Sequence, residues 1–283
     1  SRGMRVTGSE LVGLVPLQAM LDAGRHFLRK QQRSLGVPDA ETIHIAVKSL
    51  GLDELGPFNP EERIIEYRMR EGEQPRLASS TLTQFADATA AETAAPGGGS
   101  TAALVGALGA ALGTMVANLS AHKRGWDERW EEFSHWAERG QELKSELLHL
   151  VDEDTLAYER VMAAIGMPKG SEEEKVTRRA ALEAANRGAI EVPWTVMRTA
   201  FDVFELVGAM AEHGNPASAS DAGVGALCAR AAVRGAWLNV RTNVAGLKDR
   251  DSVADILTEG ARLDEEAAEQ EARILRIVEK KFG

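Results

Sequence analysis

The sequence is poor in cysteine and has no obvious metal-ligand pattern. Cys228 is the one cysteine among 283 residues, which excludes an internal disulfide and a thiolate-bound metal cluster. This composition fits a reducing compartment, and the N-terminus lacks a basic start followed by an apolar stretch. We therefore expect a cytoplasmic protein without a signal peptide. The six histidines show no metal-ligand spacing, so neither a metal nor a prosthetic group is expected.

Positively charged residues are also fewer than negatively charged ones. The chain has 33 Lys and Arg against 43 Asp and Glu, and the whole net charge of −10 lies in residues 80–283. An acidic segment repels phosphate backbones, so we do not expect nucleic acid as a partner.

Strand-like patterns are missing from most of the chain. Beyond residue 80 the amphipathic patterns predict helices at about 81–92, 100–121, 126–166, 171–212, 220–246 and 250–282. N-cap positions are predicted at Ser100, Ser171 and Ser220, and Glu174 completes a capping box with Ser171. Pro193 is expected to kink or divide the fourth helix. The fold prediction is mainly α, with residues 81–283 forming an all-α helical bundle.

The front of the chain has a different composition. Short β-like runs are predicted at 5–16 and 62–70, and helices at 17–34 and 39–52, the second with Asp39 as its N-cap. Because these strands are too few for a sheet, residues 1–70 are interpreted as an α/β remnant, the tail of a domain whose main part is absent. Residues 71–80 are polar and contain a proline, which indicates a linker.

One run, residues 94–121, carries no charge over a length that would cross a membrane. It is rich in Ala and Gly rather than Leu, Ile and Phe, and no aromatic belt flanks it. Gly106, Gly109 and Gly113 recur at spacings of three and four, which gives a face where another helix can approach closely. We therefore predict a buried bundle helix and no membrane partner.

The start of this run, "PGGGS", is not a P-loop, because it lacks the Gly-Lys-Ser/Thr ending and no strand precedes it. A glycine turn at a helix N-terminus exposes backbone N–H groups, which suit an anion, a carboxylate or a polar ring edge. The candidate binding residues of this turn are Gly97, Gly98, Gly99 and Ser100.

A carboxylate interrupts an apolar stripe in the helix predicted at 126–166. The stripe is formed by Leu147, Val151, Tyr158, Val161 and Ile165. Asp154 falls on it between Val151 and Tyr158, whereas Asp152 falls off it. A lone carboxylate on a core-facing seam is costly unless it is paired or neutralised. We therefore expect Asp154 to cap a neighbouring backbone, to pair with an arginine, to lie where the bundle opens, or to belong to a functional site.

Amides gather on the helix predicted at 220–246. Asn239 and Asn243 are four residues apart and share a face with small residues, which admits either a close helix or a ligand. Asn215 lies in the preceding polar loop, where ordinary helix capping is the alternative to ligand binding.

Five segments in order resemble the formiminotetrahydrofolate cyclodeaminase / methenyltetrahydrofolate cyclohydrolase family, over about residues 80–283. They read "APGGGSTAALVGALGAALGTMVANL", "LVDEDTLAYERVMAA", "MPKGSEEEKVTRRAALEAANRGAIEVP", "GNPASASDAGVGA" and "GAWLNVRTNV". The front segments "VTGSELVGLVPLQAMLDAGRHFLRKQQ" and "LGPFNPEERIIEY" resemble the very end of the glutamate formiminotransferase domain. In the bifunctional formiminotransferase-cyclodeaminase that domain precedes the deaminase. Its catalytic histidine and main folate groove have no counterpart here, so transferase activity is not expected.

The resemblance implies an all-α ammonia-lyase of one-carbon metabolism and histidine degradation. Such an enzyme oligomerises as a homodimer or larger assembly, acts on tetrahydrofolate with one or more glutamates, and needs no metal. The family's catalytic aspartate lies in a D-x-D-x-x-A-aromatic segment, which is here Asp152, Asp154, Ala157 and Tyr158. The helical phase selects Asp154. The folate-binding residues implied are the glycine turn with Lys123, Asp152, Asn215, Asn239 and Asn243.

The implied reaction converts 5-formimino-tetrahydrofolate to 5,10-methenyl-tetrahydrofolate and ammonia. One carboxylate can serve both proton transfers, and a rigid pocket supplies the attack geometry. Two alternatives remain open: hydrolysis of methenyl-tetrahydrofolate on the same scaffold, and a non-catalytic helical oligomerisation module.

Overall fold

The computed structural model describes residues 9–70, 76–247 and 251–282, and nearly all regular structure in these ranges is helical. The chain divides into two compact units. The first comprises residues 1–74 and 117–138, and the second comprises residues 75–116 and 139–283. Two long helices, α6 (Gly98–Ala121) and α7 (Trp130–Gly166), therefore contribute to both units.

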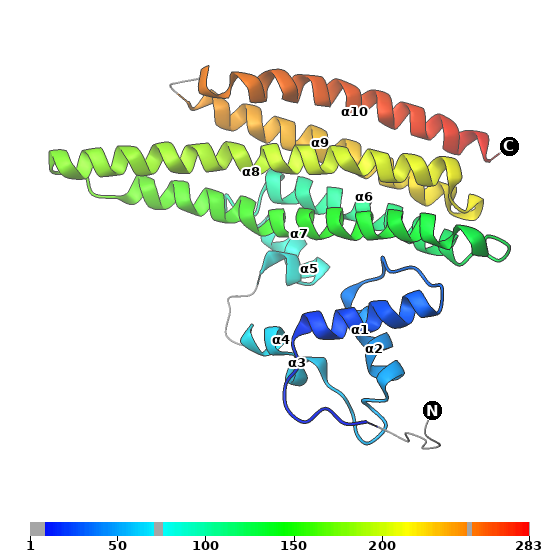
Figure 1. Cartoon of the computed structure of the whole chain (residues 1–283). Coiled ribbons are helices and arrows are strands. Elements are labelled where there is room, and N and C mark those ends of the chain that lie inside the picture. Colours follow the sequence, from blue (N-terminus) through cyan, green and yellow to red (C-terminus); the bar gives the residue numbers. More distant parts are fainter. Residues whose placement is uncertain (1–8, 71–75, 248–250, 283) are drawn as a thin grey trace, which may run out of the picture. The chain divides into compact units, whose positions relative to one another are not determined.

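The first unit contains four of the helices drawn in blue and light blue in Figure 1. They are α1 (Leu17–Lys30), α2 (Asp39–Leu50), α3 (Pro60–Arg63) and α4 (Ile65–Met69). Met20 and Leu21 of α1 pack against Ile43 and Val47 of α2, and Ile64 completes this small core. The helical predictions for 17–34 and 39–52 agree with α1 and α2.

The strand predicted at 62–70 is wrong. That segment forms α3 and α4, interrupted at Ile64, whose backbone is extended. Ile64 makes an isolated parallel bridge with Val15, which is the one β pairing among the described residues. A single bridge cannot hold a strand without further partners, so the apolar pattern "RIIEY" is accommodated in helical turns instead. Residues 5–8 of the other predicted run lie outside the described residues.

The first unit also includes the junction between α6 and α7. The backbone N–H of Leu35 donates to Ser134 Oγ at 2.9 Å, and Asn118 Nδ2 donates to the carbonyl of Gly36 at 2.9 Å. A Cβ on Gly36 would lie 2.2 Å from the backbone carbon of Ala137, so the loop after α1 needs glycine there. These contacts hold residues 117–138 against the front segment.

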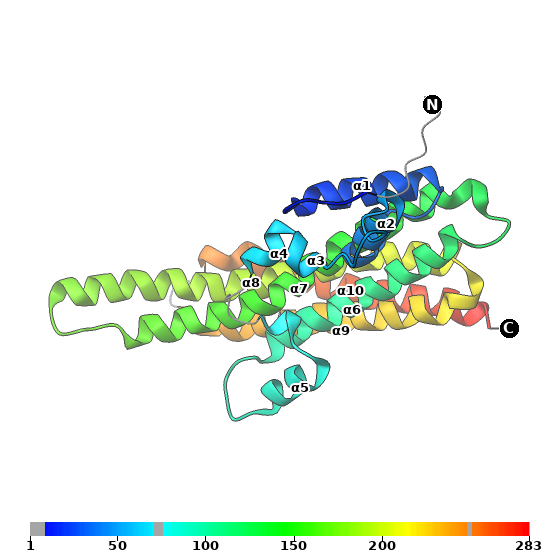
Figure 2. The same ribbon diagram turned by 90° about the horizontal axis from the view of Figure 1, so that it is seen from below.

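The second unit is a bundle of long helices (Figures 1 and 2). It contains α5 (Leu82–Ala90), α8 (Glu172–His213), α9 (Ala219–Ala245), α10 (Ala254–Lys280) and most of α6 and α7. Both views show α7 and α8 as an antiparallel hairpin, with α9 beside α8 and α10 beside α9. The predicted all-helical bundle is confirmed.

Glycines let α6 lie close to its neighbours. A Cβ on Gly109 would lie 2.9 Å from the carbonyl oxygen of Gly225 in α9, and one on Gly113 would lie 2.7 Å from Leu206 in α8. α6 is the one described helix long and apolar enough to cross a membrane, and just over half of its most apolar window is buried inside the unit. The predicted small-residue face therefore serves helix packing within the chain.

The predicted helix ends are confirmed in part. Ser171 is the N-cap of α8 and forms the predicted capping box with Glu174. Asp39 and Ser220, in contrast, are helical residues, because α2 follows Pro38 directly and a 3₁₀ turn places Ser218 at the start of α9. Ser100 also lies inside its helix, since α6 begins at Gly98. α8 continues undivided through Pro193.

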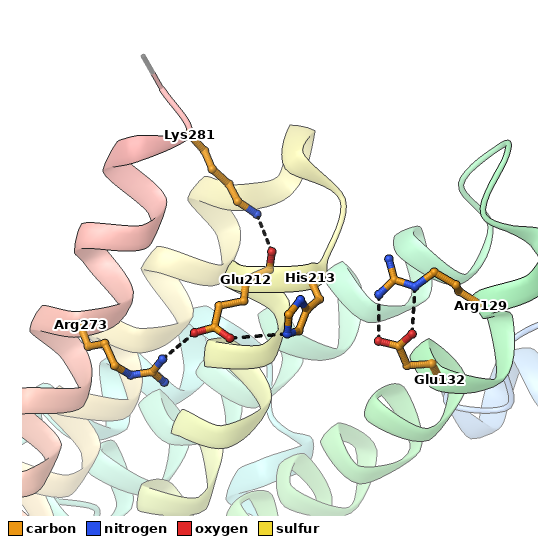
Figure 3. Close-up of polar contacts among 6 residues, drawn as sticks. All are labelled: Arg129, Glu132, Glu212, His213, Arg273 and Lys281. Atoms are coloured by element: carbon orange, nitrogen blue, oxygen red, sulfur yellow. Dashed lines mark hydrogen bonds and ion pairs between the residues drawn. The ribbon is translucent and has the colours of Figure 1, made fainter.

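Charged side chains join α10 to the rest of the second unit. Near the end of α8, Arg273 Nη1 donates to Glu212 Oε1 at 2.8 Å, and Lys281 Nζ donates to the Glu212 carbonyl at 3.3 Å (Figure 3). Farther along, the buried carboxylate of Asp264 accepts from Arg230 and Arg234 of α9. Two arginines on one buried carboxylate compensate its loss of hydration.

Candidate active site

The site is built around the N-terminus of α6. Asp154, on α7, lies against the first turn of α6, and its Oδ2 accepts a hydrogen bond from Ser100 Oγ at 2.9 Å. The backbone of Ser100 also favours the charged form of the Asp154 carboxylate. The first N–H groups of a helix have no partner within it, and the helix dipole favours negative charge there. Asp154 thus caps α6 from a neighbouring helix, one of the alternatives that the sequence left open.

Glycine at position 99 makes this contact possible. A Cβ on Gly99 would lie 2.1 Å from Asp154 Oδ1 and 2.5 Å from its Cγ. Any side chain there would push the carboxylate away from the turn. The requirement for glycine is steric, because none of Gly97, Gly98 and Gly99 has a positive φ.

Burial dominates the electrostatics of Asp154. The loss of solvent raises the pKa of its carboxyl group above the ordinary value for aspartate, although the hydroxyl and the backbone of Ser100 act in the opposite direction. Among the described residues, no charged side chain contributes to this balance. A carboxyl group with a raised pKa is a better proton acceptor than an exposed aspartate, because its protonated form is a weaker acid.

The predicted stripe around Asp154 is only partly correct. Leu147 and Val151 are fully buried, but Tyr158 and Ile165 are 38% and 48% exposed. Beyond Asp154 the buried positions on α7 are Ala157 and Ala164. Small residues line the contact between α7 and α8 there, because α7 faces the Ala-rich start of α8 (Ala181, Ala184 and Ala185). Asp154 itself is half-buried rather than fully enclosed.

Thr155 is a site residue that the sequence reasoning missed. Its Oγ1 lies 3.3 Å from Ser100 Oγ, so Ser100 stands between two polar groups of α7. Ser100 itself is fully buried. The position of Thr155 next to Asp154 is a signal that could have identified it, because an adjacent residue on the same helix can also reach the turn. However, a threonine in a helix ordinarily bonds its own backbone, which makes this signal weak.

Gly97 and Gly98 line an open groove beside the turn. This groove has a volume of about 470 Å³ and lies between α5, α6 and α9, with Thr89, Thr101, Ala102, Val105, Ala231 and Gly235 as its other lining residues. Asn239 lies next to it, because a Cβ on Gly98 would be 3.4 Å from Asn239 Nδ2. That nitrogen donates to the carbonyl of Gly235 at 2.9 Å. The structure thus brings Asn239 to the glycine turn, as predicted.

Asn243 and Asp152 have other contacts. Asn243 Nδ2 donates to the carbonyl of Ala189 at 2.6 Å and ties α9 to α8. Asp152 Oδ1 accepts from the backbone N–H of Ala78 at 3.4 Å, in the 3₁₀ turn Leu77–Ser79. Neither contact involves the glycine turn. Each of these two side chains therefore has a structural contact that competes with its predicted binding of folate.

Lys123 and Asn215 are not brought to the turn. Lys123 follows the far end of α6, and 24 helical residues at about 1.5 Å each separate the two ends by roughly 36 Å. Its ammonium lies 3.9 Å from the ring centre of Trp126. Asn215 accepts from the backbone N–H of Ala217 and caps the turn before α9. The helical length of α9 places Asn215 far from Asn239 in the same way.

A second, larger groove of about 710 Å³ lies between α8 and the start of α10. Its lining includes Arg179, Arg187 and Ile190, and none of the predicted site residues. Among the described residues, no group of three or more His, Cys, Asp and Glu side chains is placed to hold a metal ion.

Family models match both parts of the chain. Residues 81–262 match the model described as formiminotransferase-cyclodeaminase, and residues 1–70 match that of the formiminotransferase domain. The chain belongs to the formiminotransferase-cyclodeaminase family. The segment matched by the first model contains the glycine turn, Asp154 and Asn239, so the site just described lies in the cyclodeaminase part of the family.

Several curated relatives cover almost the whole chain. It is 38% identical over 277 residues to formimidoyltransferase-cyclodeaminase of Gallus gallus and 36% identical over 280 residues to that of Rattus norvegicus. The alignments include 98% and 97% of this chain, but 51% of each relative. The chain thus spans about half the length of these relatives.

Two relatives match the cyclodeaminase part over nearly their full length. Methenyltetrahydrofolate cyclohydrolase of Methylorubrum extorquens is 37% identical over 205 residues, which are 72% of this chain and 99% of that protein. The crystal structure of formiminotetrahydrofolate cyclodeaminase from Thermotoga maritima superimposes with a TM-score of 0.60 at 29% identity. That match covers 73% of this chain and 97% of the other.

Proposed function

We propose that the chain is a folate-dependent ammonia-lyase that converts 5-formimino-tetrahydrofolate to 5,10-methenyl-tetrahydrofolate and ammonia. The observation that carries this proposal is the half-buried Asp154 carboxylate held on the glycine turn by Ser100. The family match and the Thermotoga maritima cyclodeaminase support it. Asp154 is the proposed acid and base.

The first step is attack by N10 of the folate on the formimino carbon. The formimino group reacts as its cation, C=NH2+: the N10–C bond forms, the C=N electrons neutralise the formimino nitrogen as an amine, and N10 gives up its proton. Asp154 accepts that proton. Ser100 holds Oδ2, and Oδ1 has no side-chain donor among the described residues, so Oδ1 is the oxygen proposed to take the proton. General base help of this kind contributes about 10²–10⁴-fold.

The second step is loss of ammonia. Asp154 returns its proton to the former formimino nitrogen, and the C–N bond to ammonia breaks. The lone pair of N5 or N10 then forms the methenyl C=N bond. When it is charged, the Asp154 carboxylate also stabilises the positive charge on the formiminium carbon of the substrate and on the methenyl carbon of the product. The groove beside Gly97 and Gly98 offers space for the pterin, with the amide of Asn239 at its edge.

Two substrates decide between the family's reactions. The purified protein is mixed with 5-formimino-tetrahydrofolate or with 5,10-methenyl-tetrahydrofolate, and methenyl absorbance and free ammonia are followed. We expect methenyl absorbance to rise in the first mixture with one ammonia released per methenyl formed. Absence of ammonia release from the formimino compound would refute the proposed function.

Hydrolysis of methenyl-tetrahydrofolate is the second candidate. The specific support is the Methylorubrum extorquens cyclohydrolase, which the cyclodeaminase part of this chain matches almost end to end. Water would replace the amine as the reacting group, with Asp154 again as the base. Rapid loss of methenyl absorbance in the second mixture, without activity in the first, would favour this reaction.

The proposed partners are the folate substrate and further copies of the same chain. Gly106, Gly109 and Gly113 of α6 are used for packing inside the chain and do not bear on assembly. Support for a homodimer or larger homo-oligomer comes instead from apolar side chains that α6 and α9 leave 38–51% exposed: Leu108, Met115, Val224, Leu227 and Leu238. A second copy with the same face would bury them.

The remaining elements of the proposal are a cytoplasmic location and catalysis without a metal or prosthetic group. The proton transfers described above use a carboxylate alone. EDTA should leave turnover unchanged, and a loss of turnover that a divalent ion restores would contradict this part.

A further inference from the structure

Thr155 departs from the usual behaviour of threonine in this molecule. Inside helices, a threonine hydroxyl commonly donates to the carbonyl four residues earlier. Seven threonines of the second unit do so: Thr89, Thr101, Thr114, Thr177, Thr195, Thr242 and Thr258. The hydroxyl of Thr155 instead lies 3.3 Å from Ser100 Oγ, across the interface with α6.

The number of protons fixes the direction of these bonds. A serine hydroxyl has one proton to donate, and an ionised carboxylate has none. Ser100 therefore gives its proton to Asp154 Oδ2, at 2.9 Å, while Asp154 is charged. Ser100 can then only accept from Thr155. The result is a chain of donors, Thr155 to Ser100 to Asp154, that ends on the proposed base.

Such a chain affects both the charge and the orientation of the carboxylate. A hydroxyl that itself accepts a hydrogen bond is a stronger donor, so Thr155 strengthens the bond from Ser100 to Asp154. The contact also favours the observed rotamer of Ser100, because its Oγ lies near both partners in that rotamer.

Within the described part of the chain, no charged group competes with this effect. The influences on the pKa of Asp154 are burial, which raises it, and the hydroxyl and backbone of Ser100, which lower it. The facing helix α6 has no charged residue, and Asn239 of α9 is neutral. On α7, Asp152 accepts from Ala78, and Glu153 pairs with Arg160 at 3.2 Å. The hydroxyls of Thr155 and Ser100 are therefore the side-chain groups that favour the charged form of Asp154.

We propose that Thr155 is a positioning residue for the cyclodeaminase reaction: its hydroxyl orders Ser100 and, through Ser100, aims and stabilises the Asp154 carboxylate. This inference rests on the proposed function. Thr155 does not touch the reacting atoms in this scheme. Its loss should change the pH dependence and kcat and leave KM nearly constant.

The test compares three variants by their pH profiles of methenyl formation. Thr155→Val keeps the branched shape and removes the hydroxyl, and Thr155→Ser keeps the hydroxyl. Thr258→Val is the matched control, since Thr258 is an exposed threonine of α10 bonded to its own helix. A net hydrogen bond corresponds to about a three- to tenfold change, so Thr155→Val should lower kcat by that factor with little change in KM.

The sign of the pH effect follows from the donor chain. Without Thr155 the charged form of Asp154 is less well stabilised, so the carboxyl pKa rises. The acid limb of the kcat profile, which reports ionisation of the base, should then move to higher pH. Thr155→Ser should restore the wild-type limb, and Thr258→Val should not move it. An unchanged profile and kcat for Thr155→Val would overturn the inference, as would failure of Thr155→Ser to restore them.

A second readout keeps this inference separate from the proposed function. The carbonyl band of protonated Asp154 can be followed by infrared difference spectroscopy during a pH titration, with Asp154→Asn as the reference that lacks it. Thr155→Val should move its titration to higher pH in the absence of substrate. A shifted titration supports the hydroxyl chain even if neither folate is converted, whereas an unshifted one overturns it even in an active enzyme.

Discussion

Two opposing effects act on Asp154 at the scale of single residues. Burial destabilises its charge, and the N-terminus of α6 with Ser100 stabilises it, so the pKa is raised by the first and partly lowered by the second. A cap on an exposed helix would show only the stabilising effect. The balance found here suits a group that must accept a proton and then give it back.

The raised pKa also makes a prediction about stability. A carboxyl group whose folded pKa exceeds its unfolded value contributes stability below the unfolded pKa, and this contribution is lost as the pH rises through the folded value. At pH 7 the charged Asp154 is therefore unfavourable for folding. Asp154→Asn cannot ionise, so it should raise Tm at pH 7, and the gain should vanish near about pH 4.

Thermal unfolding at the two pH values checks this prediction. Asp152→Asn is the control, because the amide oxygen can still accept from the backbone of Ala78, and it should show no gain at pH 7. A lower Tm for Asp154→Asn at pH 7 would contradict the prediction. It would mean that the charge of Asp154 gains more stability at the N-terminus of α6 than it loses through burial.

Gly99 provides a test of the contact itself. A Cβ there would occupy the position of the Asp154 carboxylate, 2.1 Å from Oδ1. Gly99→Ala should therefore displace the carboxylate and reduce kcat by at least about tenfold, since misplacement by about 1 Å is costly for catalysis. Gly188→Ala in α8, where a Cβ would meet no atom within 4 Å beyond its own helix backbone and chain neighbours, should be much closer to wild type. Equal activities of the two variants would show that the contact is unimportant.

At the scale of secondary-structure elements, α6 is the helix on which the site depends. Its glycine face sets how close α8 and α9 approach, and its N-terminus receives Asp154. Gly109→Ala would place a Cβ 2.9 Å from a backbone oxygen of α9, which cannot move as a side chain can. We expect a loss of about 1–3 kcal/mol in the free energy of unfolding.

Gly188→Ala is the matched comparison for that substitution. Gly188 lies inside α8, and a methyl group at this position would have no other described atom within 4 Å beyond its own helix backbone and chain neighbours. Alanine is favoured over glycine in a helix by about 0.5–1 kcal/mol, so this variant should be more stable. Chemical denaturation measures both effects. Destabilisation by Gly188→Ala, or none by Gly109→Ala, would contradict the packing described for α6.

Local signals and tertiary contacts explain which elements the sequence could predict. The helices of the second unit follow from long periodic patterns, and the capping box at Ser171 is a purely local signal. Ser100 and Ser220 are not N-caps, because α6 begins at Gly98 and α9 begins at Ala219, before the predicted positions. The strand predicted at 62–70 is absent because its one β partner among the described residues is Val15, and a single bridge does not hold a strand.

The site could be predicted only where it depends on one helix or one turn. The phase of α7 identified Asp154, and the glycine turn was visible as a composition anomaly. Thr155 could not be chosen, because its role depends on the proton count of a serine 55 residues away. Lys123 and Asn215 were grouped with the turn by resemblance, although the lengths of α6 and α9 separate them from it.

At the scale of the whole molecule, the apolar face of α6 and α9 bears on assembly. Leu227 is 45% exposed on α9, the helix that contacts α6 through Gly225. Leu227→Arg should shift the mass of the protein toward the monomer in light scattering after gel filtration, because a charge in an apolar interface is costly. Val176→Arg, on the exposed start of α8, is the control. A wild-type monomer at micromolar concentration would refute the proposed oligomer.

The central claim is that Asp154 is the acid and base of a cyclodeaminase. The most direct measurement is the rate of methenyl formation and ammonia release from 5-formimino-tetrahydrofolate by Asp154→Asn, with Asp152→Asn beside it. Asparagine keeps the shape and still accepts from Ser100, but it cannot take a proton. We expect kcat to fall by about 10²–10⁴-fold for Asp154→Asn, with folate binding changed far less and with a much smaller effect of Asp152→Asn. Wild-type turnover by Asp154→Asn would contradict the claim.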